Sequence, residues 1–267
     1  MYFDTHVHYG YECYDGLHCE LFGEMARRGI DRVMLAGYDL ASSEKLCRIA
    51  ASYSGPLRIY IATGIHPGYI DGEPDRLLSD LERLICEHKP DALGEFGLDR
   101  RFDEKGQREL FTGQLSLCEK YSLPALVHSV GAAKETYDIL MEHSGVKGVL
   151  HGFSYAAEMA ERFCEAGWYI GIGTTLLREN AVKIKKIAAK IPAEGILAES
   201  DCPFGYGMRV NLEKDLPAKK DLPDSRCILQ IVAGIAKIRN CDEERLSQRI
   251  YDNSLRLFGN RAGDRKH

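Results

Sequence analysis

The sequence has no apolar run near the roughly 20 residues that a membrane-spanning helix requires, although 45% of its residues are hydrophobic. The N-terminus lacks a basic segment followed by an apolar one, so we expect no signal peptide. No GxGxxG sequence or phosphate-binding P-loop follows the first predicted strand, as either would in an open nucleotide-binding sheet. We therefore expect no membrane partner, and no feature indicates an obligate protein partner.

Paired cysteine motifs are also missing. The nine cysteines are scattered from Cys13 to Cys241, none forms a Cys-x-x-Cys pair, and their number is odd. Without an export signal, this pattern favours free thiols in a reducing compartment over a disulfide framework. The sequence therefore predicts a cytoplasmic protein.

The sequence also has no excess of positive charge. It contains 35 Lys and Arg residues and 40 Asp and Glu residues, which give a net charge of −5. A protein that holds long duplex DNA through its phosphates usually has a basic face. The balance argues against extended nucleic-acid binding. It still permits a site for one strand end, where bound metal ions supply the positive charge.

Short β-type runs alternate with amphipathic helical stretches along the whole chain. Eight such runs are the number that a closed parallel barrel requires. We predict a single TIM-type (β/α)₈ barrel over residues 1–267; a doubly wound open sheet is the alternative. The stretch Pro203 to Pro223 has no periodicity and indicates a long loop at the mouth. The predicted strands are Met1 to His8, Arg32 to Gly37, Arg58 to Gly64, Ala92 to Phe96, Pro124 to His128, Gly148 to His151, Trp168 to Gly173 and Gly195 to Asp201.

Histidines and acids gather where these strands end. Barrel active sites lie at the mouth formed by the C-terminal strand ends, so side chains there are expected to meet. Neutral imidazole and carboxylate together suit Zn²⁺, Mn²⁺ and similar ions. The residues in question are His6, His8, His66, Glu95, His128, His151 and Asp201.

The first strand carries the pattern Asp4-Thr5-His6-Val7-His8. Alternate residues of a strand share a face, so His6 and His8 should both point into the barrel with Asp4 one step below. Alone, such a pair is more often two ordinary half-buried histidines. The other ligand types at strand ends make the metal interpretation the favoured one.

Three acids have predicted roles near the ions. Glu95 is flanked by glycines, and its two carboxylate oxygens could bridge two cations. Glu199 and Asp201 lie two residues apart and should both face inward. Asp201, nearer the mouth, is the better ligand or base, and Glu199 would orient the ligands.

These motifs, in this order and spacing, resemble the TatD family of metal-dependent deoxyribonucleases, within the amidohydrolase-like barrels. The similarity covers essentially the whole chain, including the closing segment Tyr251 to Phe258. The motifs are Phe3-Asp4-Thr5-His6-Val7-His8, Gly64-Ile65-His66-Pro67, Gly94-Glu95-Phe96-Gly97-Leu98-Asp99, Val127-His128-Ser129, His151-Gly152-Phe153-Ser154 and Glu199-Ser200-Asp201-Cys202-Pro203.

The resemblance implies a hydrolase that removes nucleotides from DNA ends, with two divalent ions (Zn, Mn or Mg). His6, His8, Glu95 and Asp201 would surround one ion; Glu95, His128 and His151 would surround the other. His66 would lie near the substrate phosphate. We expect Glu95 and Asp201 to be catalytic, with Asp201 accepting a proton while a hydroxide activated by the two cations attacks in line.

The chain departs from the family pattern at two places that would contact substrate. His128-Ser129 continues as Val130-Gly131, where relatives often have Arg and an acid, and Phe204 to Asn211 replaces a basic, Pro-rich segment. Arg100, Arg101 and Arg209 lie on predicted mouth loops. They could neutralise phosphate or form surface salt bridges.

Aromatic residues crowd the predicted loops of the mouth. They could stack on an unpaired base or pack together as a lid. They are Tyr9, Tyr11, Tyr14, Tyr69, Phe153, Tyr155 and Tyr206.

Two other functions remain open. The same metals could serve a small-molecule hydrolase acting on a phosphoester, lactone or amide, because a fold does not fix its substrate. The acidic charge and the altered loop favour this alternative, whereas the motif set favours the nuclease. A non-catalytic binding barrel is disfavoured because every expected ligand is present.

Overall fold

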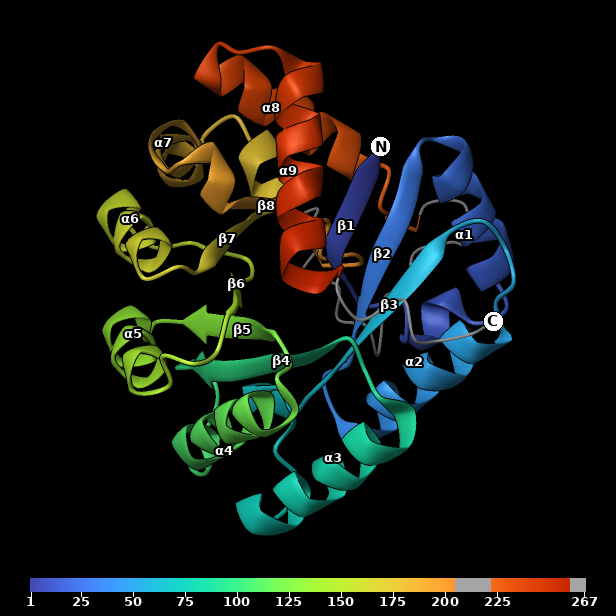
Figure 1. Ribbon diagram of the computed structural model, residues 1–267, viewed down its shortest axis with the longest axis vertical. Helices are drawn as coiled ribbons and strands as arrows, with labels where there is room; N and C mark the ends of the chain where they lie inside the picture. The colour runs from blue at the N-terminus through green and yellow to red at the C-terminus, as the bar shows by residue number, and fades with distance from the viewer. Residues whose placement is uncertain (205–221, 260–267) are drawn as a thin grey trace.

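The structure is a computed structural model that describes residues 1–204 and 222–259. Its eight parallel strands form one sheet in chain order, and helices alternate with them. Figure 1 shows these helices outside the strands. The predicted TIM-type barrel is confirmed, with each strand within a few residues of its expected place. The strands are β1 (Tyr2–Val7), β2 (Ile30–Ala36), β3 (Arg58–Thr63), β4 (Ala92–Asp99), β5 (Ala125–Val130), β6 (Gly148–Leu150), β7 (Tyr169–Ile172) and β8 (Ile196–Ala198).

Hydrogen bonds between β1 and the end of β8 bring the two edges of the sheet together. Thr5 Oγ1 donates to the Ala198 carbonyl at 3.0 Å. Farther along, the Asp201 amide donates to the His6 carbonyl at 2.9 Å, and the His8 amide donates to Cys202 at 2.8 Å. The same bonds hold Asp201 beside the two histidines.

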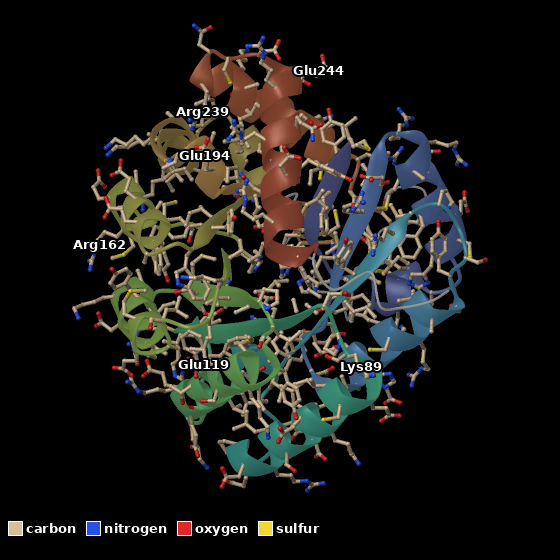
Figure 2. All side chains as sticks on the ribbon, viewed as in Figure 1. Lys89, Glu119, Arg162, Glu194, Arg239 and Glu244 are labelled. Carbon is tan, nitrogen blue, oxygen red and sulfur yellow. The ribbon has the colours of Figure 1, made fainter. Side chains whose placement is uncertain are left out.

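Nine longer helices accompany the strands in the described residues. Within this part of the chain, no helix is long and apolar enough to cross a membrane. Figure 2 shows charged side chains such as Glu119, Arg162 and Glu244 on the outer surface of the helices. The helices are α1 (His18–Arg27), α2 (Leu40–Ser52), α3 (Pro74–His88), α4 (Gln107–Tyr121), α5 (Ala133–Glu142), α6 (Ala157–Glu165), α7 (Val182–Lys190), α8 (Cys227–Arg239) and α9 (Glu243–Phe258).

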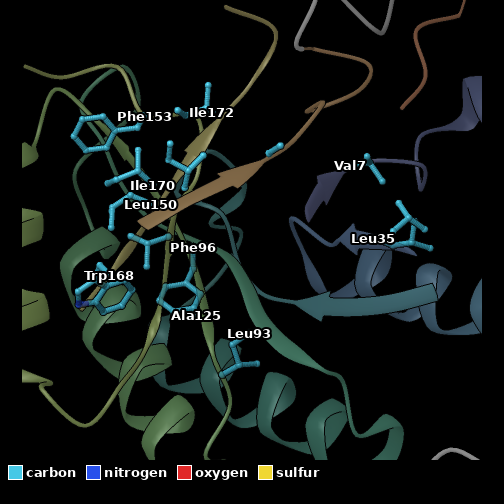
Figure 3. Packing of buried hydrophobic residues seen from close by; sticks show 14 of the residues in the cluster. Val7, Leu35, Leu93, Phe96, Ala125, Leu150, Phe153, Trp168, Ile170 and Ile172 are labelled. Carbon is cyan, nitrogen blue, oxygen red and sulfur yellow. The ribbon is translucent and has the colours of Figure 1, made fainter. Parts of the chain in front are cut away.

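Two layers of buried side chains hold the barrel together. One layer includes Phe96 and Phe111, whose ring centroids are 5.8 Å apart between β4 and α4; Figure 3 shows part of this layer. A smaller cluster joins strand residues to α9, where the Phe258 ring lies 5.9 Å from Phe3. Helix α9 thereby covers the N-terminal end of the barrel and leaves the opposite mouth to the site.

Strands β1 and β4 each carry one extra residue close to a predicted ligand. On β1, Asp4 and Val7 are three positions apart, whereas their partners on β2 are two positions apart. On β4 the same shift falls between Leu93 and Phe96, around Glu95. A bulge bends a strand and re-aims its side chains.

The bulge on β1 changes one expectation. Regular alternation predicts Asp4 in the same row as His6 and His8, but the extra residue breaks that alternation. The Asp4 carboxylate instead accepts a hydrogen bond from the Ser200 amide at 2.9 Å. Asp4 therefore supports the chain that leads into Asp201, and it is not a further group inside the barrel.

Removal of the Phe111 side chain should test how much the packing between β4 and α4 stabilises the barrel. Phe111 is 0% exposed, so Phe111→Ala should lower the free energy of unfolding by about 3–5 kcal/mol through lost burial and a cavity. Phe102→Ala, at a side chain that is 44% exposed, is the control and should change it by less than about 0.5 kcal/mol. Urea unfolding followed by circular dichroism measures both, and equal losses would contradict this account of the core.

Candidate metal centre

Six of the predicted residues converge at the C-terminal mouth of the barrel. They come from β1 and the residue that follows it, from β4 and β5, and from the segments that follow β6 and β8. Five are buried, and the side chain of Asp201 is 26% exposed. Groups of their ligand atoms lie within 4.8 Å of one another. The residues are His6, His8, Glu95, His128, His151 and Asp201.

Four of these side chains form a first donor group. His8 Nε2 lies 3.2 Å from His6 Nε2 and 3.5 Å from Asp201 Oδ1. Glu95 Oε2 lies 3.4 Å from His6 Nε2 and 3.2 Å from His8 Nε2. Four ligands of one tetrahedral zinc ion, bound at about 2.0–2.1 Å, lie about 3.3 Å from one another. The spacing and the donor types therefore fit a divalent ion.

The other oxygen of Glu95 belongs to a second donor group. Glu95 Oε1 lies 2.7 Å from His128 Nδ1 and 3.0 Å from His151 Nε2. The two imidazole nitrogens are 3.4 Å apart. The Glu95 carboxylate thus offers one oxygen to each donor group. The two groups also touch through His6 of the first and His151 of the second, whose rings stack with centroids 3.9 Å apart.

Glycines on either side of Glu95 let β4 lie very close to β5. Gly94 and Gly97 have φ values of +147° and +151°, which favour glycine. A Cβ on Gly97 would lie 1.9 Å from the His128 carbonyl oxygen, and one on Gly94 would lie 2.5 Å from Leu126 Cβ. This close approach brings Glu95 and His128 together.

Second contacts orient the imidazoles. His8 Nδ1 lies 3.0 Å from the Ala36 carbonyl, which can only accept, so Nδ1 keeps its proton and Nε2 would be the ligand atom once a bound ion replaces its proton. His128 has the opposite arrangement, because its Nε2 lies 2.9 Å from Asp99 Oδ2 and its Nδ1 faces Glu95. Such outer contacts raise the basicity of a ligand and fix its ring.

Asp99 is the residue of the centre that sequence reasoning missed. Its carboxylate is held by both the backbone amide and the guanidinium of Arg101. These hydrogen bonds and that to His128 outweigh burial and lower the pKa of Asp99. Its position at the end of β4, four residues after Glu95, was the available signal.

Glu199 lies beneath the second donor group. Its Oε1 accepts a hydrogen bond from the Gly152 amide at 2.6 Å and lies 3.6 Å from His151 Nδ1. Glu199 is completely buried. This placement agrees with the expectation that it orients ligands while Asp201 faces the mouth.

Opposite charges stabilise one another inside this buried cluster. Burial opposes ionisation of Glu95, but the charge of His151 and the hydrogen bonds from His128 and His151 outweigh it and hold the pKa of this carboxyl well below its usual value. Burial also opposes protonation of His8, yet hydrogen bonds with Asp201 and Glu95 raise its pKa to about 9. A buried anion with this many cationic or coordinating neighbours is typical of a functional site.

His66 differs from the other histidines of the mouth. Its Nδ1 accepts a hydrogen bond from the Gly68 amide at 2.9 Å, and burial lowers its pKa to about 3. The ring is therefore neutral near pH 7 and carries its proton on Nε2, 3.7 Å from Glu95 Oε1. In this form Nε2 is a donor, so His66 is suited to donate a hydrogen bond into the cavity; it also shares with Glu95 and His128 a group of ligand-type atoms that lie within 4.8 Å of one another.

The three predicted arginines have different surroundings. Arg100 pairs with Glu104 and with Glu135, the latter at 2.8 Å, and does not line the site cavity. Arg101 lines the cavity but is held by Asp99. Arg209 lies outside the described residues.

A cavity of about 440 Å³ opens above the ligands. Much of its wall is aromatic: the Tyr11 and Tyr38 rings stack at 4.8 Å, and Tyr69 lies 4.5 Å from Tyr38. Among the aromatic residues predicted for the mouth, Tyr11 and Tyr69 line this cavity. Tyr9 and Tyr14 are instead buried in the core, and Tyr206 lies outside the described residues. We call the lining rings the aromatic wall: Tyr11, Tyr38, Tyr69, Phe102 and Phe204.

Comparison with known proteins connects this centre with one family. A family model described as TatD related DNase matches residues 3–259. An uncharacterized metal-dependent hydrolase of Bacillus subtilis, YabD, is 27% identical over 263 residues, which cover 97% of this chain and 99% of that protein. Another from Escherichia coli, YjjV, is 29% identical over 266 residues and covers 96% of each chain.

Solved structures give the same picture. The crystal structure of YjjV, a TatD homologue from Escherichia coli, superposes with a TM-score of 0.84 at 26% identity over 97% of this chain and 98% of that one. A phosphotriesterase from Mycobacterium tuberculosis, at 18% identity, has a TM-score of 0.64 over 90% of this chain and 83% of its own. The second likeness concerns the fold alone.

Asp99 should control metal affinity through His128. Asp99→Ala removes the acceptor that fixes the ring, and outer contacts of this kind are worth roughly 10–100-fold in affinity. We expect a loss of that size for Zn²⁺ in a competition titration with a chromogenic chelator, and partial recovery in Asp99→Asn. Glu104→Ala, at a surface side chain that is 66% exposed, is the control. Equal affinities in all four proteins would exclude the positioning role.

Proposed function

The chain belongs to the TatD family of metal-dependent hydrolases, and from this membership we propose that it is a phosphodiesterase that removes nucleotides from DNA ends. The observation that carries the proposal is the division of the Glu95 carboxylate, which presents Oε2 to His6 and His8 and Oε1 to His128 and His151. That arrangement suits two divalent ions, zinc or manganese above all, because the donors are mostly imidazole.

In this proposal Asp201 completes the ligands of the first ion and Glu95 belongs to both. When bound, such ions act as Lewis acids on phosphoryl oxygens and make an attacking water more acidic. The residues of the chain hold the reacting groups and move the proton. Asp201 has the most exposed side chain of the donor set and lines the cavity, so it is placed to accept the proton from the attacking water.

His66 and the aromatic wall would hold the substrate. The neutral ring of His66 points its Nε2 proton toward the cavity and can donate it to a phosphoryl oxygen. Tyr69 and Phe102 are 40% and 44% exposed beside this imidazole, with ring centroids 5.8 Å and 6.0 Å from it. Exposed aromatic faces suit stacking with an unpaired base, which supports a strand end over a duplex.

A small phosphoester remains the second candidate, and the charge of the cavity favours it. Arg101 is the one arginine that the described residues contribute to this cavity, and Asp99 already engages it. The net charge of −5 adds no long-range attraction for a polynucleotide. The metals and His66 would act on either substrate in the same way.

We also propose that the protein works in the cytoplasm. None of its nine cysteines, all within the described residues, is in a disulfide. Four of these thiols are buried. Disulfides form and persist in oxidising compartments, so a chain whose cysteines are all free thiols favours a reducing compartment. Fractionation of cells that express the tagged protein would test this location.

Loss of Glu95 should abolish turnover, because each oxygen serves a different donor group. Wild type, Glu95→Ala and the surface control Glu44→Ala would be loaded with Mn²⁺ or Zn²⁺ and given end-labelled single-stranded DNA, with small phosphoesters, lactones and amides in parallel. We expect wild type and Glu44→Ala to shorten the DNA and Glu95→Ala to lose at least 1,000-fold in rate, roughly the effect of removing a metal-centred group. Asp201→Ala should behave like Glu95→Ala.

The substrate panel separates the candidates. Turnover of small phosphoesters without DNA shortening would favour the second candidate. Turnover by Glu95→Ala at the wild-type rate would refute the centre itself.

His66 should affect substrate binding and leave metal binding intact. His66→Ala removes a neutral donor, and we expect KM for a phosphodiester to rise about tenfold, the value of one hydrogen bond of about 1.4 kcal/mol. His66→Gln, which keeps a donor, should recover part of the loss. Unchanged Zn²⁺ affinity in both variants is part of the expected result, and a large fall in that affinity would make His66 a ligand.

A further inference from the structure

A second cavity of about 480 Å³ lies on the other side of the metal centre. It is bounded by residues after β6 and β7 and by the start of α7. Asp201 lines both cavities, while His151 lines the first and its neighbour Gly152 lines the second. Each volume falls within the roughly 300–1,000 Å³ typical of small-ligand pockets. The two cavities therefore extend in different directions from one acid of the centre.

The chemistry of the second cavity differs from that of the aromatic wall. Phe153, Val182 and Ile184 give it an apolar side, and Thr174 and Asn180 add short polar groups. Thr174 is 4% exposed, and its hydroxyl has no hydrogen-bond partner in the described part of the chain. A buried hydroxyl without a partner is costly unless a ligand or water satisfies it.

The rim of this cavity is open and weakly charged. Val182 is 73% exposed, an unusual position for a large aliphatic side chain, and it begins α7 at the edge of the cavity. Lys183 is the single cation that the described residues contribute to the lining, and the acids Glu199 and Asp201 line the cavity where it meets the metal centre. This wall suits a group with a carbon face and hydroxyl substituents, and it offers little to a chain of phosphates.

A phosphodiester carries two organic groups, each joined to the phosphorus through an ester oxygen; we call these groups its two arms. Resting on the function proposed above, we propose that the second cavity binds a sugar arm of the substrate. The aromatic wall takes the ring on the other arm, and the phosphorus lies between them at the metal centre. When the arm binds, the Thr174 side chain, whose hydroxyl is closed to solvent in the structure, rotates to bond a sugar oxygen, and Val182 covers the carbon face. The enzyme thus selects a diester with one flat arm and one hydroxylated arm.

Three chromogenic diesters test this assignment. Each carries 4-nitrophenol on one arm; the other arm is methyl 2-deoxyriboside joined through O5, cyclopentylmethyl, or methyl. The first two arms share a five-membered ring on a methylene group, and the sugar arm adds a ring oxygen, one hydroxyl and a methoxy group. With Mn²⁺-loaded wild type, we expect kcat/KM to fall in the order sugar, cyclopentylmethyl, methyl, measured by release of 4-nitrophenolate.

Two variants connect that order with the cavity. Val182→Trp fills the open rim and should lower the ratio of kcat/KM for the sugar diester to that for the methyl diester at least tenfold. Thr174→Val keeps the shape and removes the hydroxyl, so it should lower the sugar-to-cyclopentylmethyl ratio about three- to tenfold. Leu177→Trp, at an apolar side chain that is 37% exposed and does not line the cavity, is the control and should keep both ratios.

Failure of this assignment can be told from failure of the proposed function. If wild type cleaves the diesters and Val182→Trp keeps both ratios, the second cavity binds no arm and the inference is overturned. If wild type cleaves none of them, the phosphodiesterase proposal fails, and calorimetry with non-hydrolysable methylphosphonate analogues decides the cavity. The cavity assignment would be supported if wild type binds the sugar analogue more tightly than the other two and Val182→Trp loses this preference. Equal binding of all analogues by wild type would overturn it.

Discussion

The structure depends most on one buried carboxylate, that of Glu95, which is shared between two sets of imidazoles. An isolated buried carboxylate is strongly disfavoured in a protein interior unless charges or coordinating groups compensate it. Here four histidine nitrogens lie 2.7–3.4 Å from its two oxygens. These neighbours reverse the effect of burial and keep the pKa of Glu95 low. The same contacts gather imidazole and carboxylate donors of the kind that a divalent ion binds.

The barrel places these groups by a few local departures from regular structure. Bulges in β1 and β4 interrupt the alternation of side chains at His6 and at Glu95. Gly97 lets β4 approach the backbone of β5 more closely than any side chain would permit. Asp201 has φ of +54°, a left-handed conformation that Asp tolerates better than most residues. Deviations of this kind occur where a site needs side chains in fixed directions, and helix α9 leaves the mouth open by covering the other end.

Metal chemistry and substrate choice belong to different parts of the mouth. The ligands come from strand ends, which the closed sheet fixes, whereas the aromatic wall and the second cavity come from the connecting segments. Barrel enzymes commonly vary their substrates through such segments while the strand ends keep the reaction. Under the proposed function, this division would let one set of ligands act on DNA ends or on small diesters.

The sequence by itself determined the fold class and the donor set, because both depend on signals local in the chain. Alternating strands and helices predicted eight β/α units, and His or acidic residues at strand ends predicted a shared mouth. Tertiary structure decided what spacing could not. Three features depend on partners distant in sequence: the bulge that removes Asp4 from the row of His6 and His8, the pairing of Asp99 with His128, and the ion pair of Arg100 with Glu135. A residue type indicates what a side chain can bind, but only the folded chain determines which atom it faces.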